Sequence, residues 1–194
     1  MTPLLKKNNV QGQVFVVSAP SGSGKTTLCR KMLARFPFLS YSISHTTRTP
    51  RKDEKQGIDY FFITKEEFLD KIKQNFWAEW AEVHDNLYGT SLEFIKQKIR
   101  DGSSLLLDID VQGAKQIKSS LPDSVTIFIM PPSFKVLEQR LRSRGTDSED
   151  VIQKRLANAA KEIKEKDFYD FSIVNDDLDR ASLELAQIME RTFL

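Results

Sequence analysis

A run rich in glycine and serine carries the strongest chemical signal in this chain: Ala19, Pro20, Ser21, Gly22, Ser23, Gly24, Lys25 and Thr26. The run matches the Walker A phosphate-binding loop, with alanine in place of the usual first glycine. Gly22 and Gly24 can adopt backbone angles closed to other residues, so successive N–H groups can turn toward one anion. Lys25 supplies a charge for the β- and γ-phosphates, and the Thr26 hydroxyl can ligate Mg²⁺.

The segments on either side of the loop supply the context that the pattern requires. Residues 13–18 before it are typical of a buried parallel strand, and residues 27–36 after it predict a helix ended by Pro37. A strand, a loop and a helix in this order aim a helix N-terminus at a phosphate. The alternative is a glycine- and serine-rich turn that contains a lysine by chance, which would not explain both flanks.

Two carboxylates stand at the end of the apolar run 104–108. Asp108 closes the run at the position of a Walker B carboxylate, which holds Mg²⁺ together with the loop hydroxyl of Thr26. The alternative is an aspartate that caps the next helix. Asp110 follows at i+2, so both carboxylates project to one side if the strand continues through it.

A basic loop offers a second anion site. Arg48 and Arg51 lie three apart in a stretch that Pro50 prevents from forming a strand. Two guanidinium groups, with the hydroxyls of Tyr60 and Tyr88, would make a site for a dianion. From spacing alone a solvated basic loop remains the more frequent outcome.

Glu79 lies in a segment with strand alternation, on the same face as Trp77, whereas Trp80 points the other way. Such a carboxylate is either an exposed strand residue or a reader of a base. The edge of guanine presents N1–H and N2–H₂. A carboxylate can accept a hydrogen bond from each of these two groups at once.

A charged segment near the C-terminal third holds further arginines. Arg140 and Arg144 lie four apart on one face of an expected helix, opposite Arg142, and Arg155 follows later. The segment is either a salt-bridged surface helix or a lid whose arginines reach a phosphoryl group when it closes. His45 and His84 have no metal-like spacing, and we assign neither a catalytic role.

The composition narrows the class of protein. The 194 residues include 29 Lys and Arg against 27 Asp and Glu, a net charge of +2, which argues against a nucleic-acid binder driven by bulk charge. No apolar run approaches the length of a membrane span, and residues 1–11 resemble a flexible leader rather than a secretory signal. The single Cys29 cannot form an internal disulfide, which fits a reducing cytosol.

The pattern of apolar residues predicts an α/β fold that positions these groups. Expected strands cover 13–18, 39–44, 59–63, 77–83, 104–108, 125–129 and 171–174. Expected helices cover 27–36, 64–74, 92–100, 111–119, 134–144 and 178–191, and 145–166 is largely helical. We expect a core of 12–43, 93–133 and 166–194, interrupted by a short-stranded lobe (44–92) and a helical lid (134–165).

Taken together, these residues resemble guanylate kinases, P-loop kinases of nucleoside monophosphates, over nearly the whole chain. The matching pieces are Ser18–Leu28, Ser44–Arg51, Gly57–Tyr60, Glu79–Ala81, Tyr88–Thr90, Leu107–Gly113, Arg144–Thr146 and Ile173–Asp176. One departure is Asp53, where the family usually has glycine, and it leaves the path of the basic loop open. The resemblance implies a P-loop kinase core with a five-stranded parallel sheet flanked by helices, a GMP-binding lobe and a lid.

The resemblance also implies a role for each site residue. Residues Ala19 to Thr27 would bind ATP, with Asn175 near the adenine, and Thr26 and Asp108 would hold Mg²⁺. The GMP phosphate would be held by Arg48, Arg51, Tyr60 and Tyr88, and the guanine by Ser44, Glu79, Thr90 and Asp110. The catalytic set would be Lys25, Arg48, Arg140, Arg144 and Arg155.

The implied reaction is ATP + GMP → ADP + GDP, with dGMP as a further acceptor, in purine nucleotide metabolism of the cytoplasm. The implied partners are these small molecules, with no nucleic acid and no membrane, for a monomer or homodimer. Two alternatives remain open: a ribose-bisphosphate phosphokinase of the same fold, and an inactive guanylate-kinase-like module that binds phosphopeptides. The residues Glu79, Thr90 and Asp110 argue against the first, and the intact Gly24-Lys25-Thr26 against the second.

Overall fold

A five-stranded parallel sheet forms the centre of the fold in the computed structural model, which describes residues 12–83, 85–143, 145 and 148–193. The strand order is β2-β7-β1-β8-β9, and every neighbouring pair is parallel. The strands are β1 (Val14–Ser18), β2 (Ser40–Tyr41), β7 (Leu105–Asp108), β8 (Val125–Met130) and β9 (Phe171–Val174). The predicted parallel sheet flanked by helices is therefore confirmed.

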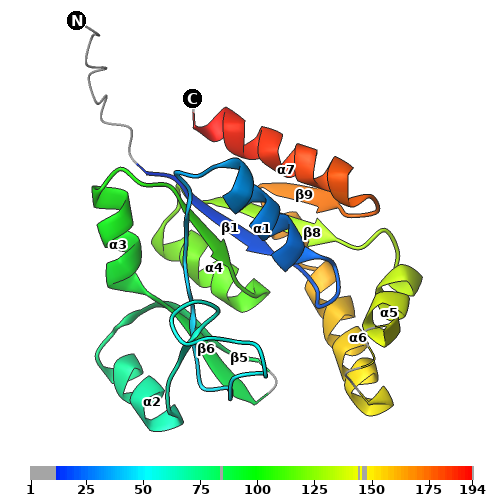
Figure 1. The fold of residues 1–194 in the computed structure, drawn as a ribbon, viewed down its shortest axis with the longest axis horizontal. Coiled ribbons are helices and arrows are strands. Elements are labelled where there is room, and N and C mark those ends of the chain that lie inside the picture. The colour runs from blue at the N-terminus through cyan, green and yellow to red at the C-terminus, as the bar shows by residue number, and fades with distance from the viewer. Residues whose placement is uncertain (1–11, 84, 144, 146–147, 194) are drawn as a thin grey trace, which may run out of the picture.

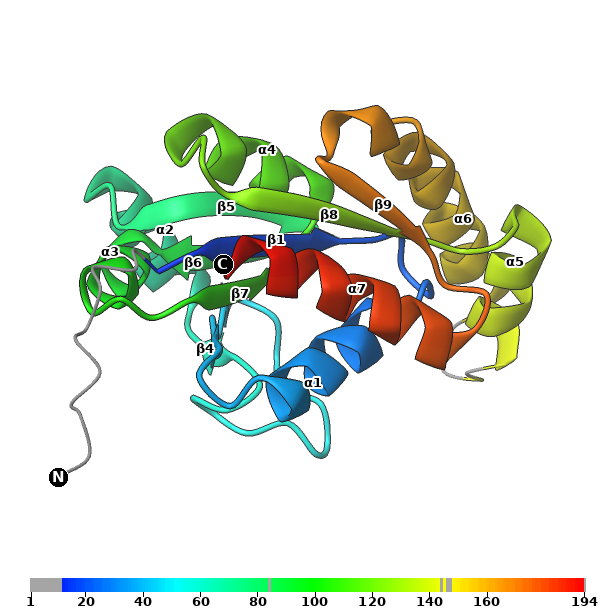
Figure 2. The same cartoon turned by 90° about the horizontal axis from the view of Figure 1, so that it is seen from above.

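Helices cover both faces of this sheet. Helices α1 (Lys25–Arg35) and α7 (Leu178–Thr192) pack on one face, and α3 (Leu92–Arg100) and α4 (Val111–Ser120) on the other (Figures 1 and 2). Alternate residues of β1 serve the two faces: Phe15 and Val17 face α1 and α7, and Val14 and Val16 face α4. All five residues of β1 are buried, as expected of a central parallel strand.

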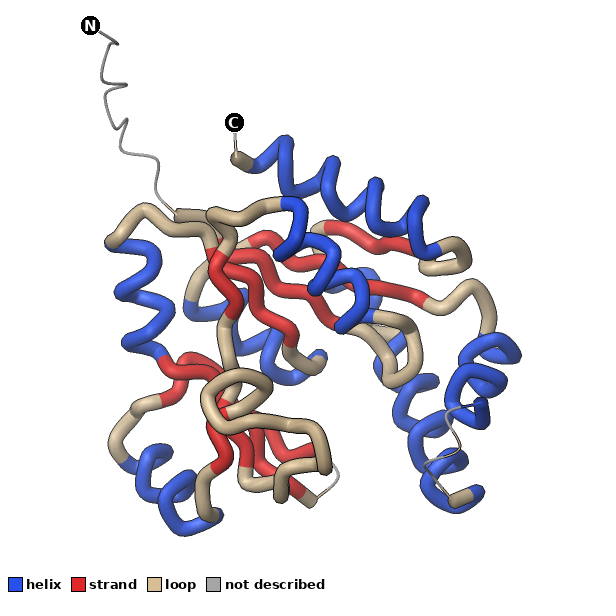
Figure 3. The backbone as a smooth tube through the Cα atoms, viewed as in Figure 1, coloured by secondary structure: helices blue, strands red, loops and turns tan. Residues whose placement is uncertain are grey.

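A second, four-stranded sheet lies beside the first. Its order is β4-β3-β6-β5, and the strands are β3 (His45–Thr46), β4 (Phe61–Phe62), β5 (Trp77–Val83) and β6 (Asn86–Ser91). The segment between β3 and β4 is drawn as a long loop in Figure 3. Helix α2 (Lys65–Lys73) begins with a capping box of Thr64 and Glu67, and its Phe68 stacks on Trp77 with ring centroids 4.3 Å apart.

Helices α5 (Phe134–Ser143) and α6 (Glu149–Ile163) pack against each other, away from the four-stranded sheet (Figure 1). They share a small apolar core made of Leu137, Leu141, Ile152, Leu156 and Ala159. A short 3₁₀ helix, η1 (Lys166–Phe168), then leads into β9. Within the described residues, no helix combines the length and apolar character needed to cross a membrane.

Several expected elements differ from the structure. The single strand expected over 39–44 is wrong: β2 ends at Tyr41, and β3 begins at His45 in the other sheet. The chain leaves β7 after the Ser42 N–H donates to Leu106 O, because the next residues pair with β6 instead. The expected strand over 59–63 shortens to β4, and α1 begins two residues early, at Lys25.

Candidate active site

A cavity of about 360 Å³ opens at the carboxyl ends of β1 and β7. Ligands of open α/β sheets bind at this edge, outside the carboxyl ends of the strands. The cavity brings together many of the predicted site residues, namely 19–27, Ser44, Arg51, Tyr60, Glu79, Tyr88, Asp108, Asp110 and Arg155. Of the predicted residues that the structure describes, four do not line it: Arg48, Thr90, Arg140 and Asn175.

The glycine- and serine-rich loop has the backbone geometry that its sequence predicts. Gly22 and Gly24 have φ of 96° and 88°, in the left-handed region that favours glycine. Gly24 is the N-cap of α1, so the first N–H groups of that helix face the cavity end of the loop. An anion placed there would be bound by backbone donors and by the positive end of the helix dipole.

The side chain of Asn175 stabilises the conformation of this loop. Its side-chain amide donates to Ser23 O at 2.7 Å, and only 4% of the residue is exposed. A Cβ added at Gly24 would lie 2.3 Å from Asn175 Nδ2, so glycine is required there for space as well as for its φ. The contact observed for Asn175 is therefore with the loop backbone.

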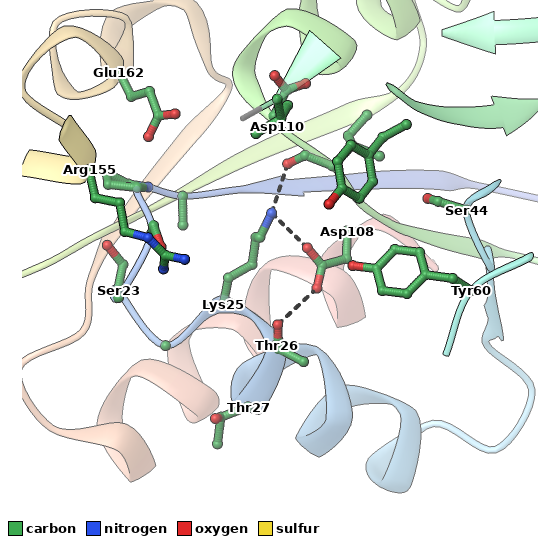
Figure 4. A pocket seen from close by; sticks show the side chains of 18 of the residues that line it. Ser23, Lys25, Thr26, Thr27, Ser44, Tyr60, Asp108, Asp110, Arg155 and Glu162 are labelled. Atoms are coloured by element: carbon green, nitrogen blue, oxygen red, sulfur yellow. Dashed lines mark hydrogen bonds and ion pairs between the residues drawn. The ribbon is translucent and has the colours of Figure 1, made fainter. Parts of the chain in front are cut away.

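Lys25, Thr26 and Asp108 form a connected group at the centre of the cavity (Figure 4). Lys25 Nζ lies 2.7 Å from Asp108 Oδ1 and donates to Ile109 O at 2.9 Å. The Thr26 hydroxyl donates to Asp108 Oδ2 at 3.3 Å. Burial would lower the pKa of Lys25, but the charge and hydrogen bond of Asp108 outweigh it and hold that pKa above its ordinary value.

Asp110 does not extend the strand. β7 ends at Asp108, and Asp110 is the N-cap of α4, where Oδ1 accepts from Gly113 N at 2.9 Å. The condition for both carboxylates to project from one continuous strand is therefore not met. Asp110 still lines the cavity, because the first turn of α4 begins at its edge.

Glu79 is a buried carboxylate that faces the cavity from β5. It is 3% exposed, and its Oε1 accepts a hydrogen bond of 2.5 Å from the Thr90 hydroxyl on β6. The predicted alternation is confirmed, since Trp77 is also buried and Trp80 is 38% exposed. The pKa of Glu79 is raised to about 7, chiefly by burial; the Thr90 hydrogen bond opposes the shift, and the charge of Asp110 adds to it.

Glu54 fixes the conformation of the loop that carries Arg48 and Arg51. Arg48 Nη2 lies 2.8 and 2.9 Å from the two oxygens of Glu54, whose Oε2 also accepts from Arg51 N at 2.8 Å. The Arg48 guanidinium lies 5.4 Å from the ring centroid of Tyr60. The side chain of Arg51 is 71% exposed. The acid that pairs with Arg48 is thus Glu54, six residues further along the chain, and not the neighbouring Asp53 that departs from the family pattern.

Known proteins of one family resemble this chain along most of its length. A family model described as guanylate kinase matches residues 11–192. The chain belongs to the guanylate kinase family. A guanylate kinase of Nitratidesulfovibrio vulgaris is 53% identical over 182 residues, covering 93% of this chain and 88% of that protein. One of Syntrophotalea carbinolica is 50% identical over 185 residues, covering 95% and 87%.

A solved structure agrees as well. The crystal structure of guanylate kinase from Anaplasma phagocytophilum superposes with a TM-score of 0.76 at 34% identity, covering 95% of this chain and 88% of that one. The resemblance to guanylate kinases that the sequence indicates is thus confirmed over nearly the whole chain, for both sequence and fold.

The arginines expected on the lid of a guanylate kinase lie in different surroundings. Arg155 Nη1 donates to Ser21 Oγ at 3.2 Å, which joins α6 to the phosphate-binding loop. Arg140 Nη2 donates to Asn175 O at 2.9 Å, at the edge of the same loop. Arg142 points elsewhere and pairs with Glu138 and Glu149. Arg144 lies outside the described residues, as does His84.

Two oxygen-bearing side chains in the cavity could bind a metal ion. Thr26 and Asp108 provide a hydroxyl and a carboxylate within hydrogen-bond distance of each other. Such hard oxygen ligands suit Mg²⁺, which keeps several waters and takes further ligands from substrate phosphates. Among the residues that the structure describes, no cluster of three or more His, Cys, Asp or Glu side chains could hold a metal by itself.

Proposed function

We propose that this chain transfers the γ-phosphoryl group of ATP to GMP, giving ADP and GDP, and accepts dGMP as well. The observation that supports the proposal is a single cavity whose two ends differ in chemistry. Lys25 and the backbone of residues 19–27 make one end suited to a triphosphate, and the buried Glu79 makes the other suited to a base with N–H donors.

The donor half consists of the loop, Lys25, Thr26 and Asp108. Thr26 and Asp108 would hold Mg²⁺, which would supply positive charge to neutralise the phosphates. Once a phosphate lies on the loop, Lys25 exchanges the Asp108 carboxylate for phosphate oxygens. Asn175 holds the loop in shape through Ser23 O, and this supports ATP binding indirectly.

The acceptor half consists of two groups of residues. Arg48, Arg51, Tyr60 and Tyr88 would bind the phosphate of GMP, and Glu54 orients Arg48 for this task. Ser44, Glu79, Thr90 and Asp110 would bind the guanine. Thr90 would do so through Glu79, because its hydroxyl holds one oxygen of that carboxylate in place.

The chemistry needs no general base. The acceptor atom is a phosphate oxygen that is already anionic near neutral pH, so catalysis consists of in-line positioning and neutralisation of charge. Lys25 and the lid arginines Arg140, Arg144 and Arg155 supply that charge, and one such arginine contributes on the order of 10³–10⁵ in rate. Closure of the lid over both substrates excludes water and prevents hydrolysis of ATP.

Selectivity for guanine follows from the buried carboxylate. With AMP in the site, Glu79 would lose its N–H partners and face the lone pair of N1. Polar mismatches of this kind reach roughly 10⁴ in discrimination. We also propose the three-part division of the sequence, with core, GMP-binding lobe (44–92) and lid (134–165), in a cytoplasmic monomer or homodimer that acts in purine nucleotide metabolism.

A coupled assay of ADP release tests the proposal, with GMP, AMP, UMP, CMP and ribose 1,5-bisphosphate offered as acceptors. We expect rapid turnover with GMP and at least about 10³-fold less with the other mononucleotides. Turnover with ribose 1,5-bisphosphate but not GMP would favour a ribose-bisphosphate phosphokinase. No turnover with any acceptor, together with binding of a phosphopeptide, would favour a non-catalytic module.

A further inference from the structure

Glu162, near the end of α6, faces the cavity and has no role in the site described above. It lines the cavity together with Lys25, Asp110 and Arg155, and it is half-buried. Figure 4 shows Glu162 and Arg155 extending from the same side of the cavity toward Lys25 and Asp110. The two side chains are seven residues apart, which is two helical turns and about 10 Å along one face of α6.

This carboxylate lacks a partner within the described part of the chain. No hydrogen bond or ion pair joins Glu162 to any described residue, although Glu165 on the same segment pairs with Lys115. Lys25, the cation whose charge acts on Glu162, is already engaged by Asp108. Burial raises the pKa of Glu162; the charge of Lys25 opposes the shift and that of Asp110 adds to it. A half-buried, unpaired carboxylate lacks the compensation that buried polar groups normally have.

The surroundings restrict what the missing partner is. A phosphate is excluded, because two anions would repel. The carboxylates of Glu79 and Asp110 line the same cavity, so Glu162 adds a third acid near the end assigned to the acceptor nucleoside. Three carboxylates there require N–H or O–H donors, and a nucleoside offers these on its base and its sugar.

We infer that Glu162 is a further specificity-determining residue, whose carboxylate accepts a hydrogen bond from the exocyclic amine or the 2′-hydroxyl of the acceptor nucleoside. The inference rests on the proposed function and extends it to the lid. Because Arg155 stands on the same helix and already contacts Ser21, an acceptor held by Glu162 would fix α6 and keep this arginine beside the phosphate-binding loop. Acceptor binding and the placement of a catalytic arginine thus become linked through α6.

Steady-state kinetics of Glu162→Ala and Glu162→Gln test the inference, with Glu184→Gln on the exposed face of α7 as the matched control. We expect Glu162→Ala to raise the KM for GMP about 10-fold or more, as for loss of a hydrogen bond to a charged group. Glu162→Gln keeps one acceptor oxygen, so its effect is smaller. The KM for ATP and the melting temperature stay near those of the wild type.

Acceptors that lack one donor identify the contact. IMP lacks the exocyclic amine and dGMP lacks the 2′-hydroxyl. The penalty of Glu162→Ala disappears with IMP if the amine is the donor, and with dGMP if the sugar hydroxyl is. An equal penalty with all three acceptors, or a KM for GMP within twofold of the wild type, overturns the inference. If Glu162→Ala fails to fold, the isosteric Glu162→Gln decides in the same assay. Failure of the wild type to phosphorylate GMP would instead refute the proposed function.

Discussion

Lys25 Nζ lies 2.7 Å from Asp108 Oδ1, so the two central charges of the donor site neutralise each other in the structure. The pair is largely buried, with side chains 20% and 10% exposed, and water screens it only weakly. Each group has another expected partner in the reaction: phosphate oxygens for Lys25 and the metal ion for Asp108. The ion pair therefore holds both side chains in place, and we expect binding of a metal nucleotide to separate them.

Replacement of the lysine tests its role in phosphoryl transfer. We expect Lys25→Ala to lower kcat by at least about 10³-fold, because the charge on the β- and γ-phosphates is lost in the transition state. Calorimetry should still find GMP binding within about threefold of the wild type, since the acceptor half is unchanged. Lys31→Ala, which removes an exposed lysine of α1, is the control. Normal turnover of Lys25→Ala would refute the assigned mechanism.

We expect the Mg²⁺ dependence of activity to change when Asp108 is replaced. We expect Asp108→Asn to raise the Mg²⁺ concentration that gives half-maximal activity by about 10-fold or more, because an amide is a weaker ligand than a carboxylate. Thr26→Ser keeps the hydroxyl ligand and should behave like the wild type, whereas Thr26→Ala should shift the Mg²⁺ titration in the same direction as Asp108→Asn. An unchanged titration for Asp108→Asn would remove this residue from the metal site.

Base recognition should depend on Glu79. We expect Glu79→Ala to raise the KM for GMP about 100-fold with the KM for ATP unchanged within threefold, because only the acceptor loses its hydrogen bonds. Glu82→Ala, on the exposed face of the same strand, serves as the control in the same initial-rate assay. A GMP KM like that of the wild type would exclude Glu79 from the base site.

The raised pKa of Glu79 also predicts a pH dependence. Only the ionised carboxylate accepts the guanine donors, so kcat/KM for GMP should rise with pH through about 7. The phosphate of GMP adds a separate rise near its own second pKa of about 6. Glu79→Gln cannot titrate, and it should therefore abolish the rise near 7 and retain the one near 6. A pH profile of Glu79→Gln identical in shape to that of the wild type would contradict the assignment.

The same shift predicts an effect on stability. The folded-state pKa of about 7 lies above the ordinary value of 4.5, so the favourable contribution of the neutral carboxyl is present below pH 4.5 and is lost as pH rises through 7. Glu79→Gln should thus be more stable than the wild type at pH 8, by about 1–3 kcal/mol of unfolding free energy. Urea denaturation at pH 5 and pH 8 checks this, and a stability difference independent of pH would contradict it.

Asn175 offers a test of direct against indirect nucleotide contact. Asn175→Ala leaves Ser23 O without its donor, so we expect kcat/KM for ATP to fall about 10-fold and stability by about 1–3 kcal/mol. If Asn175 acts only on the loop, the factor is the same when GTP replaces ATP as the donor. A loss confined to ATP would instead support the adenine contact that the family resemblance implies.

Local chemistry made much of the fold predictable from the sequence. The strand over 77–83, the helix over 92–100 and the strand over 171–174 were predicted with the bounds that the structure has, because periodicity and capping residues mark their ends. The segment 39–44 was predicted wrongly, because its alternation contains no sign that one end joins the parallel sheet and the other the four-stranded sheet. Such a division is set by partners distant in the chain.

The candidate site divides in the same way. Three features could be predicted from the sequence: the glycine- and serine-rich loop, the carboxylate of Asp108 at a strand end, and the placement of Glu79 on the same strand face as Trp77. Each depends on neighbours within a few residues, whereas the burial of Glu79 is seen in the structure. Three other relationships are visible in the folded chain alone: Asp108 pairs with Lys25, Asn175 donates to Ser23 O, and Glu162 faces the cavity from α6. Such contacts join residues that are far apart in the chain, and packing of whole elements brings them together.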